Sequence, residues 1–213
     1  MKITVLGTTS QQEEFRKKKL PEGSEIFFVP TLEALSIISP SFIIFDLSFE
    51  PSTKRIELLT SLNKPVIINS VVNTLKGLGL PDSFIRMNAW PGFINREITE
   101  VAIGFDAQKE SVQTIFQLLN WQYQLTPDTP GMISARIIAM IVNEAYFALG
   151  EEVSSKQEID IAMKLGTNYP FGPFEWSKKI GLKNIYNLLV KLSSTGKRYN
   201  IAPLLEKEAL QQK

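Results

Sequence analysis

Apolar runs of strand length alternate with segments of helical spacing through the first 125 residues. The strand candidates are Lys2–Leu6, Glu25–Val29, Phe42–Leu47, Pro65–Ile68, Phe84–Met87 and Ile98–Ile103. The helix candidates between them are Ser10–Lys19, Thr31–Ile38, Thr53–Leu62 and Lys109–Leu119. Phe42–Leu47 is apolar almost throughout, as expected for a strand that is buried on both faces. The alternation predicts a mostly parallel sheet covered by helices on both faces, which is a Rossmann-like α/β domain.

The pattern becomes helical after residue 125. The segments with helical spacing there are Met132–Leu149, 157–165 and 182–193, and a Pro/Gly/aromatic loop is predicted over Asn168–Trp176. We therefore predict two domains, a Rossmann-like domain at residues 1–125 and a helical domain at residues 126–213. Met132–Leu149 is apolar on most of its faces, so it is either a central core helix or a helix with a spare face for a second subunit. Both interpretations stay open.

Two helix starts are predicted from capping residues. Ser10 is expected to cap the first helix, with Glu13 three residues later as its capping-box partner. Thr129 is expected to cap the long helix, with Pro130 at its first position.

Composition restricts the available chemistry. The chain contains no cysteine and no histidine. Disulfides, thiolate nucleophiles, cysteine-ligated zinc and serine–histidine machinery are therefore excluded, and we expect no metal site. Any general base would have to be a carboxylate, a lysine or a tyrosine.

Charge and hydropathy argue against nucleic-acid and membrane partners. The formal net charge is +1, from 23 basic and 22 acidic residues, and the basic run Arg16–Lys19 is expected to close a helix. No apolar run approaches the roughly 20 residues of a membrane span. Since the chain also begins without a signal-peptide pattern, we expect a cytoplasmic protein.

The second half resembles the C-terminal domain of the 3-hydroxyacyl-CoA dehydrogenase family. The residues that carry the resemblance are Asp128–Ile133, Arg136, Asn143–Ala145, Ile159–Asp160, Ala162–Met163, Leu165–Gly166, Tyr169–Phe174, Gly181–Leu182, Tyr199 and Pro203–Leu205. In that family this domain forms the dimer and one wall of the substrate cleft. The resemblance thus implies a homodimer through the helical domain and a possible acyl-CoA-like ligand.

The first half resembles the NAD-binding domain of the same family more weakly. Ser83–Met87 precedes the position at which the family has its catalytic histidine, and Asn88 stands there in this chain. The family's catalytic glutamate lies twelve residues further on, at Glu100. The resemblance therefore implies that the glutamate is retained and the histidine is lost.

The expected substrate pocket lies between the two domains, near Asn73, Asn88, Glu100 and Ala135. The family's substrate-binding serine falls near Asn73, and Ala135 replaces an asparagine that precedes the arginine of the long helix. The aromatic residues Trp90 and Phe93 either line this pocket or belong to the core. The chain is also shorter than the family before Phe42, where the family has a helical excursion that helps to bind CoA.

The cofactor fingerprint is also degenerate. A dinucleotide fingerprint reads G-x-G-x-x-G, and Gly7 is followed by Thr9 and Gln12 at the other two glycine positions. Two carboxylates, Glu13 and Glu14, are expected in the first helical turn, where they would repel a diphosphate. The acidic residue that holds the ribose is also absent after the second strand. We expect Gly7 and Thr9 to mark a weakened site with no cofactor, or NAD if the family's activity survives.

Three functions follow from these observations. The first, which we favour, is a non-catalytic family member that acts as a homodimeric scaffold or binds an acyl-CoA-like ligand. The second is an active NAD(P)-dependent oxidoreductase on a 3-hydroxyacyl-CoA or related substrate, with a base such as Glu100. The third is a subunit that acts only with a separate partner protein.

Overall fold

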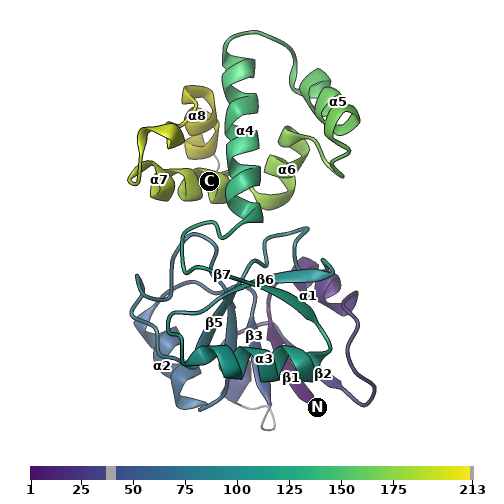
Figure 1. Cartoon of the computed structure of the whole chain (residues 1–213), viewed down its shortest axis with the longest axis vertical. Coiled ribbons are helices and arrows are strands. Elements are labelled where there is room, and N and C mark those ends of the chain that lie inside the picture. Colours follow the sequence, from purple (N-terminus) through teal and green to yellow (C-terminus); the bar gives the residue numbers. More distant parts are fainter. Residues whose placement is uncertain (37–41, 212–213) are drawn as a thin grey trace. The chain divides into compact units, whose positions relative to one another are not determined.

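The computed structural model describes residues 1–36 and 42–211, and these divide into two compact units (Figure 1). The first unit is Met1–Met132 and the second is Ile133–Lys213. The division falls seven residues beyond the predicted boundary, because the loop after residue 126 is bonded to the first unit. We describe each unit by itself.

The first unit is built on one seven-stranded sheet in the order β2-β1-β3-β4-β5-β6-β7. The strands are β1 Lys2–Leu6, β2 Glu25–Val29, β3 Ile43–Asp46, β4 Val66–Asn69, β5 Phe84–Met87, β6 Ile98–Ala102 and β7 Gln122–Thr126. All pairs from β2 to β5 are parallel, β5 and β6 are antiparallel, and β6 and β7 are parallel to each other. The helices of this unit are α1 Thr9–Arg16, the 3-10 helix η1 Glu33–Ser36, α2 Thr53–Ser61 and α3 Gln108–Leu119.

Two hydrophobic clusters cover the two faces of this sheet. In β3, Ile43 and Phe45 belong to one cluster, together with Phe15 of α1 and several residues of α3. Ile44 belongs to the other cluster, which includes Leu59 of α2. Because successive side chains of a strand point to opposite faces, a strand covered on both sides must be apolar in succession. The predicted Rossmann-like fold class is confirmed, and so is the burial of this strand on both faces.

The predicted start of the first helix was wrong. Thr8, not Ser10, is the N-cap, and its box partner is Gln11 rather than Glu13. The helix therefore begins two residues earlier in the chain, directly after the turn at Gly7. Its first turn contains no acidic residue, so the expected carboxylates of Glu13 and Glu14 lie further along the helix. The helix ends at Arg16, so most of the basic run lies beyond it.

The predicted start of the long helix was also wrong. The helix α4 is Ser134–Gly150, and neither Thr129 nor Pro130 belongs to it. Gly131 has φ +80° and Met132 has φ +50°, and two successive residues of positive φ interrupt a right-handed helix. The N–H of Gly131 donates to the carbonyl of Val71 at 2.8 Å, which holds this loop on the first unit.

The second unit packs helices around α4. They are α5 Lys156–Thr167, α6 Pro173–Ile180, α7 Leu182–Ser193, the 3-10 helix η2 Lys197–Tyr199 and α8 Pro203–Gln211. The helix α4 contacts α6, α7 and α8. The predicted helices at 157–165 and 182–193 are confirmed, while β7, α6 and α8 were missed. The expected helix at Thr31–Ile38 is limited to η1 up to Ser36, and its last two residues lie outside the described part of the chain.

Buried polar contacts hold the second unit together. Oδ1 of Asp160 in α5 accepts from the N–H of Phe174 at 2.8 Å and so satisfies the start of α6. A Cβ atom at Gly172 would lie 2.5 Å from Cα of Asp160, so no side chain fits there. The side chain of Asn143 donates to the carbonyl of Asn200 at 2.8 Å and accepts from the N–H of Ala202 at 2.9 Å. Three of the residues that carry the resemblance in this unit, Asn143, Asp160 and Gly172, thus position its helices.

Candidate functional site

Asn88, one of the two predicted catalytic positions, lies directly beyond the end of β5, and Glu100, the other, lies within β6. Since β1, β3, β4 and β5 are mutually parallel, their carboxyl ends share one edge of the sheet. The residues at or just beyond these ends are Gly7, Leu47, Asn69 and Asn88. In open α/β sheets this edge is where ligands bind.

Asn88 follows β5 and is 2 % exposed. Its N–H donates to the carbonyl of Glu100 at 3.1 Å, and its Oδ1 accepts from the N–H of Trp90 at 3.4 Å. Its Nδ2 is buried without a hydrogen-bond partner in the described part of the chain. The structure therefore brings the two predicted catalytic positions together as backbone neighbours on β5 and β6.

Glu100 lies in β6 opposite Gln124 of β7 and is half-buried. Its charge acts on Arg96. Burial lowers the pKa of Arg96, and the negative charges of Glu100 and Glu14 partly offset that effect. The guanidinium of Arg96 also lies 4.1 Å from the ring centre of Phe93. Glu100 thus has a nearby cation in its own unit.

Lys18, which follows the C-terminal end of α1, is also part of this charged group. Its Nζ donates to the carbonyl of Arg96 at 2.7 Å and to Oγ1 of Thr99 at 2.8 Å. It lies 4.4 Å from the ring centre of Trp121. Burial lowers the pKa of Lys18 to about 8, because water no longer fully solvates the ammonium group.

The remaining predicted pocket residues are placed as follows. Asn73 lies in the loop after β4, where its carbonyl accepts from Oγ of Ser70 at 2.9 Å. Ala135 lies in the first turn of α4, in the second unit, and is fully buried. Trp90 and Phe93 follow β5 and are both buried. The assignment of Asn73 and Ala135 to a substrate pocket stays a prediction.

The predicted cofactor residues lie in the turn between β1 and α1. Gly7 is buried and Thr9 is exposed as the first residue of the helix. The turn is closed by side chains of α1. Nε2 of Gln11 donates to the carbonyl of Leu47 at 2.6 Å, and Nε2 of Gln12 donates to the carbonyl of Gly7 at 2.8 Å.

A buried ion pair near the same edge was missed by sequence reasoning. Arg86 in β5 pairs with Asp128, whose carboxylate also accepts from the N–H groups of Leu75 and Lys76. The guanidinium further donates to the carbonyl of Ser70 at 2.7 Å. The sequence signal that could have revealed this ion pair is an arginine between the apolar residues of a strand, because a buried charge requires a buried partner.

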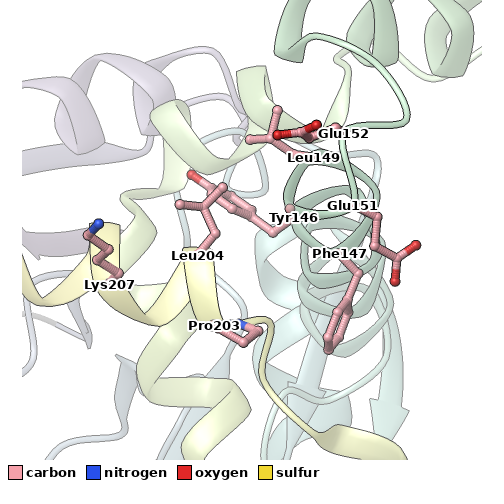
Figure 2. A pocket seen from close by; sticks show the side chains of 9 residues that line it. Tyr146, Phe147, Leu149, Glu151, Glu152, Pro203, Leu204 and Lys207 are labelled. Atoms are coloured by element: carbon pink, nitrogen blue, oxygen red, sulfur yellow. The ribbon is translucent and has the colours of Figure 1, made fainter.

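The second unit carries a groove of about 660 Å³ between the end of α4 and the start of α8. Figure 2 shows its lining residues, among them Tyr146, Leu149 and Leu204. The hydroxyl of Tyr146 donates to Oε2 of Glu208 at 2.8 Å. Burial and the charge of Glu208 raise the pKa of Tyr146, so this hydroxyl stays a donor at neutral pH.

The described part of the chain contains neither a metal-binding cluster nor a membrane-spanning helix. No cluster of three or more acidic side chains is placed to hold a metal ion within residues 1–36 and 42–211. Over the same residues, no helix is both long enough and apolar enough to cross a bilayer.

Comparisons with known proteins agree with the predicted resemblance. Residues 131–213 match the family model described as 3-hydroxyacyl-CoA dehydrogenase, C-terminal domain. The chain is 46% identical over 85 residues to 3-hydroxyadipyl-CoA dehydrogenase of Escherichia coli, which covers 39% of this chain and 18% of that protein. It is 33% identical over 132 residues to 3-hydroxybutyryl-CoA dehydrogenase of Clostridioides difficile, which covers 60% of this chain and 47% of that protein. The chain thus spans less than half the length of these two relatives.

A solved structure matches over both units. It is (S)-3-hydroxybutyryl-CoA dehydrogenase from Ralstonia eutropha, with a TM-score of 0.70 and 18% identity, and the match covers 97% of this chain and 92% of the other. At this identity the match shows the fold. The predicted resemblance of the second half to the C-terminal domain of this family is confirmed, and so is the predicted pair of fold classes.

Proposed function

From the premise that the chain belongs to the 3-hydroxyacyl-CoA dehydrogenase family, we propose that it is a non-catalytic member that acts as a homodimeric scaffold and binds an acyl-CoA-like ligand. The observation that carries this proposal is the side chain at position 88. An amide donates and accepts hydrogen bonds but cannot take up the proton that a hydroxyacyl oxidation releases. Asn88 is also buried, and its Oδ1 accepts from the N–H of Trp90.

The surroundings of Glu100 support a structural role for the retained glutamate. In an acid–base pair the carboxylate would orient a histidine, and the chain has none. Arg96 instead lies within the electrostatic reach of Glu100. Its backbone carbonyl is also bonded by Lys18, so the loop that carries Arg96 is held against α1. The negative charge of Glu100 then partly balances the positive charge of the half-buried Arg96.

The apolar surface of the second unit supports the homodimer. Ile137 on α4 is 49% exposed, and Leu165 on α5 is 84% exposed. Ile133 and Ile161 lie one helical turn before them and are also exposed. Large apolar side chains exposed at i and i+4 on two helices form the kind of surface that a subunit interface covers. We propose that these four residues lie in the dimer interface.

The test of this proposal compares the wild-type protein with Asn88→His. The wild type is mixed with acetoacetyl-CoA and either NADH or NADPH, and oxidation of the nicotinamide is followed by absorbance. We expect no turnover from the wild type. A positioned base contributes about 10²–10⁴ in rate, so turnover by Asn88→His that is absent from the wild type would support the loss of the base at position 88.

Turnover by the wild type that is lost in Glu100→Gln would contradict the proposal and favour an active oxidoreductase with a glutamate base. Sedimentation of the same sample checks the assembly. A dimer that becomes a monomer in Leu165→Glu supports the proposed interface, while an unchanged monomer excludes it.

A further inference from the structure

The strand order places a switch point between β1 and β3. From β1 the chain passes to β2 on one side and then crosses back to β3 on the other side. In sheets of this kind a dinucleotide binds outside the carboxyl ends of the two strands at this point. Here those ends lead to Gly7 and Leu47, and the N–H of Leu47 donates to the carbonyl of Leu6 at 2.8 Å.

The first polar side chain of α1 that reaches this point is Gln11. Its Nε2 donates to the carbonyl of Leu47 at 2.6 Å and so crosses from α1 to the end of β3. Its Oε1 accepts from the N–H of Thr8 at 3.0 Å and from the hydroxyl of Thr8 at 3.2 Å. The side chain of Gln11 thus forms hydrogen bonds with backbone groups just beyond the ends of both β1 and β3.

The N–H groups at the start of α1 are also in use. The N–H of Gln11 donates to Oγ1 of Thr8 at 3.4 Å, and the N–H of Gln12 donates to the carbonyl of Thr8 at 2.9 Å. A diphosphate at a helix start is bound by N–H groups of this kind. In this chain the capping box satisfies the N–H of Gln11, and the first backbone bond of the helix satisfies that of Gln12.

Gln12 and Glu14 extend the same pattern. Nε2 of Gln12 donates to the carbonyl of Gly7 at 2.8 Å and to that of Val29, at the end of β2, at 3.4 Å. The carboxylate of Glu14 accepts from the N–H groups of Gly92 at 2.9 Å and Ile94 at 3.1 Å. The N–H groups of the loop after β5 therefore donate to a carboxylate of α1.

Gly7 has a different purpose in this arrangement. A Cβ atom at Gly7 would lie 3.2 Å from Oε1 of Gln11 and 3.2 Å from Cβ of Leu47. The absence of a Cβ atom at Gly7 therefore eases the close approach of Gln11 and Leu47. A glycine at this position is accounted for without a diphosphate near the turn.

We propose that side chains of α1 fill the switch point themselves. NAD does not fit there, because Gln11, Gln12 and Glu14 already form hydrogen bonds with the backbone groups that would contact it. The three side chains are called the α1 clamp below. The inference deepens the proposed non-catalytic function, since it rests on that function and names the contacts that replaced the cofactor. It predicts that the clamp stabilises the first unit and that the wild type binds no dinucleotide.

Thermal unfolding tests the structural half of this proposal. Gln11→Ala and Gln12→Ala are compared with Gln113→Ala, which removes an exposed glutamine from α3. Loss of one or two side-chain hydrogen bonds is expected to lower Tm by about 2–6 °C in each clamp variant. Glu14→Gln is compared with Glu13→Gln, its exposed neighbour, and the same ordering is expected. Equal Tm values for clamp and control variants would overturn the clamp.

Fluorescence titration with NADH and with ADP-ribose tests the other half. The wild type is expected to bind neither at millimolar concentration. The triple variant Thr9→Gly/Gln11→Ala/Gln12→Gly, which restores the glycine spacing, is expected to bind NADH at least about ten-fold more tightly than the wild type. If this variant does not fold, the wild-type titration decides the matter, because a dissociation constant below 0.1 mM, on the order of 5–6 kcal/mol of binding, would overturn the inference.

The two proposals fail separately. If the wild type binds NADH but does not reduce acetoacetyl-CoA, the proposal that the α1 clamp excludes the cofactor is wrong, while the proposed loss of catalysis still holds. If the wild type reduces acetoacetyl-CoA, the proposed non-catalytic function is wrong, whatever the Tm values of the clamp variants.

Discussion

The two units of this chain differ in what their family-like residues do. In the second unit, Asp160, Gly172 and Asn143 carry the resemblance, and each positions a helix. In the first unit, the residues at the positions that the resemblance assigns to cofactor binding and proton transfer, Thr9, Gln12 and Asn88, are bonded within their own unit or lie in its turns. The difference between the two units is therefore that the resemblance rests on packing residues in the second, whereas in the first it does not extend to the residues that would carry chemistry.

The largest expected effect comes from Asp128, a motif residue that belongs to the first unit. Asp128→Ala leaves the buried guanidinium of Arg86 without its carboxylate and two N–H groups without an acceptor. We expect a loss of about 3–5 kcal/mol in the free energy of unfolding, measured by urea denaturation.

The control for Asp128 is Asp106→Ala, which removes an exposed partner of Lys109 and should change stability by less than about 1 kcal/mol. A cost at Asp128 no larger than at Asp106 would show that the motif is not retained for structure in this unit.

Gly172→Ala tests the same principle in the second unit. The new methyl group would lie 2.3 Å from Oδ1 and 2.5 Å from Cα of Asp160, so α5 and α6 must separate. We expect a loss of about 2–4 kcal/mol in urea denaturation. Gly166→Ala is the matched control, since nothing lies within 4 Å of its Cβ position in α5. That variant is expected to gain about 0.5–1 kcal/mol, because alanine favours a helix.

A smaller effect is expected from Lys18 and depends on pH. Burial lowers its pKa from 10.5 to about 8, so between these values the unfolded chain binds more protons than the folded one. The free energy of unfolding should therefore rise as the pH increases from about 8 to 10.5. In Lys18→Met this part of the slope should disappear, relative to wild type measured by urea denaturation in the same buffers. Identical slopes would show that the ammonium is solvated like that of a surface lysine.

Much of this fold was accessible from local patterns. The apolar run at Phe42–Leu47 predicted a strand buried on both faces, because β3 is covered by α1 and α3 on one side and by α2 on the other. The helix at Leu182–Ser193 was predicted to the residue, since its apolar spacing and the preceding Gly181 are local signals.

The parts that local patterns did not reveal depend on distant contacts. Ser10 and Thr8 are both acceptable N-caps with a suitable residue three positions later, and the close turn at Gly7 selects Thr8. Thr129 and Pro130 have the chemistry of a helix start, but Arg86 and Val71 hold their loop on the sheet.

The candidate site shows the same limit. The sequence pointed to Asn88 and Glu100, and the structure places Asn88, directly after β5, beside Glu100 of β6. It gave no sign that Glu14 would accept from the loop at Gly92–Ile94, because that contact joins residues 78 and 80 positions apart. The carboxylate of Glu14, which we expected to repel a bound diphosphate, instead accepts hydrogen bonds from backbone N–H groups of the same chain.

A calorimetric titration of the wild-type protein with NADH and, separately, with acetoacetyl-CoA distinguishes a non-catalytic ligand binder from a working dehydrogenase. We expect no heat of binding for NADH at millimolar concentration and saturable binding for the CoA ester. Saturable binding of NADH that strengthens when acetoacetyl-CoA is present would contradict this expectation, because a ternary complex of that kind belongs to a working dehydrogenase.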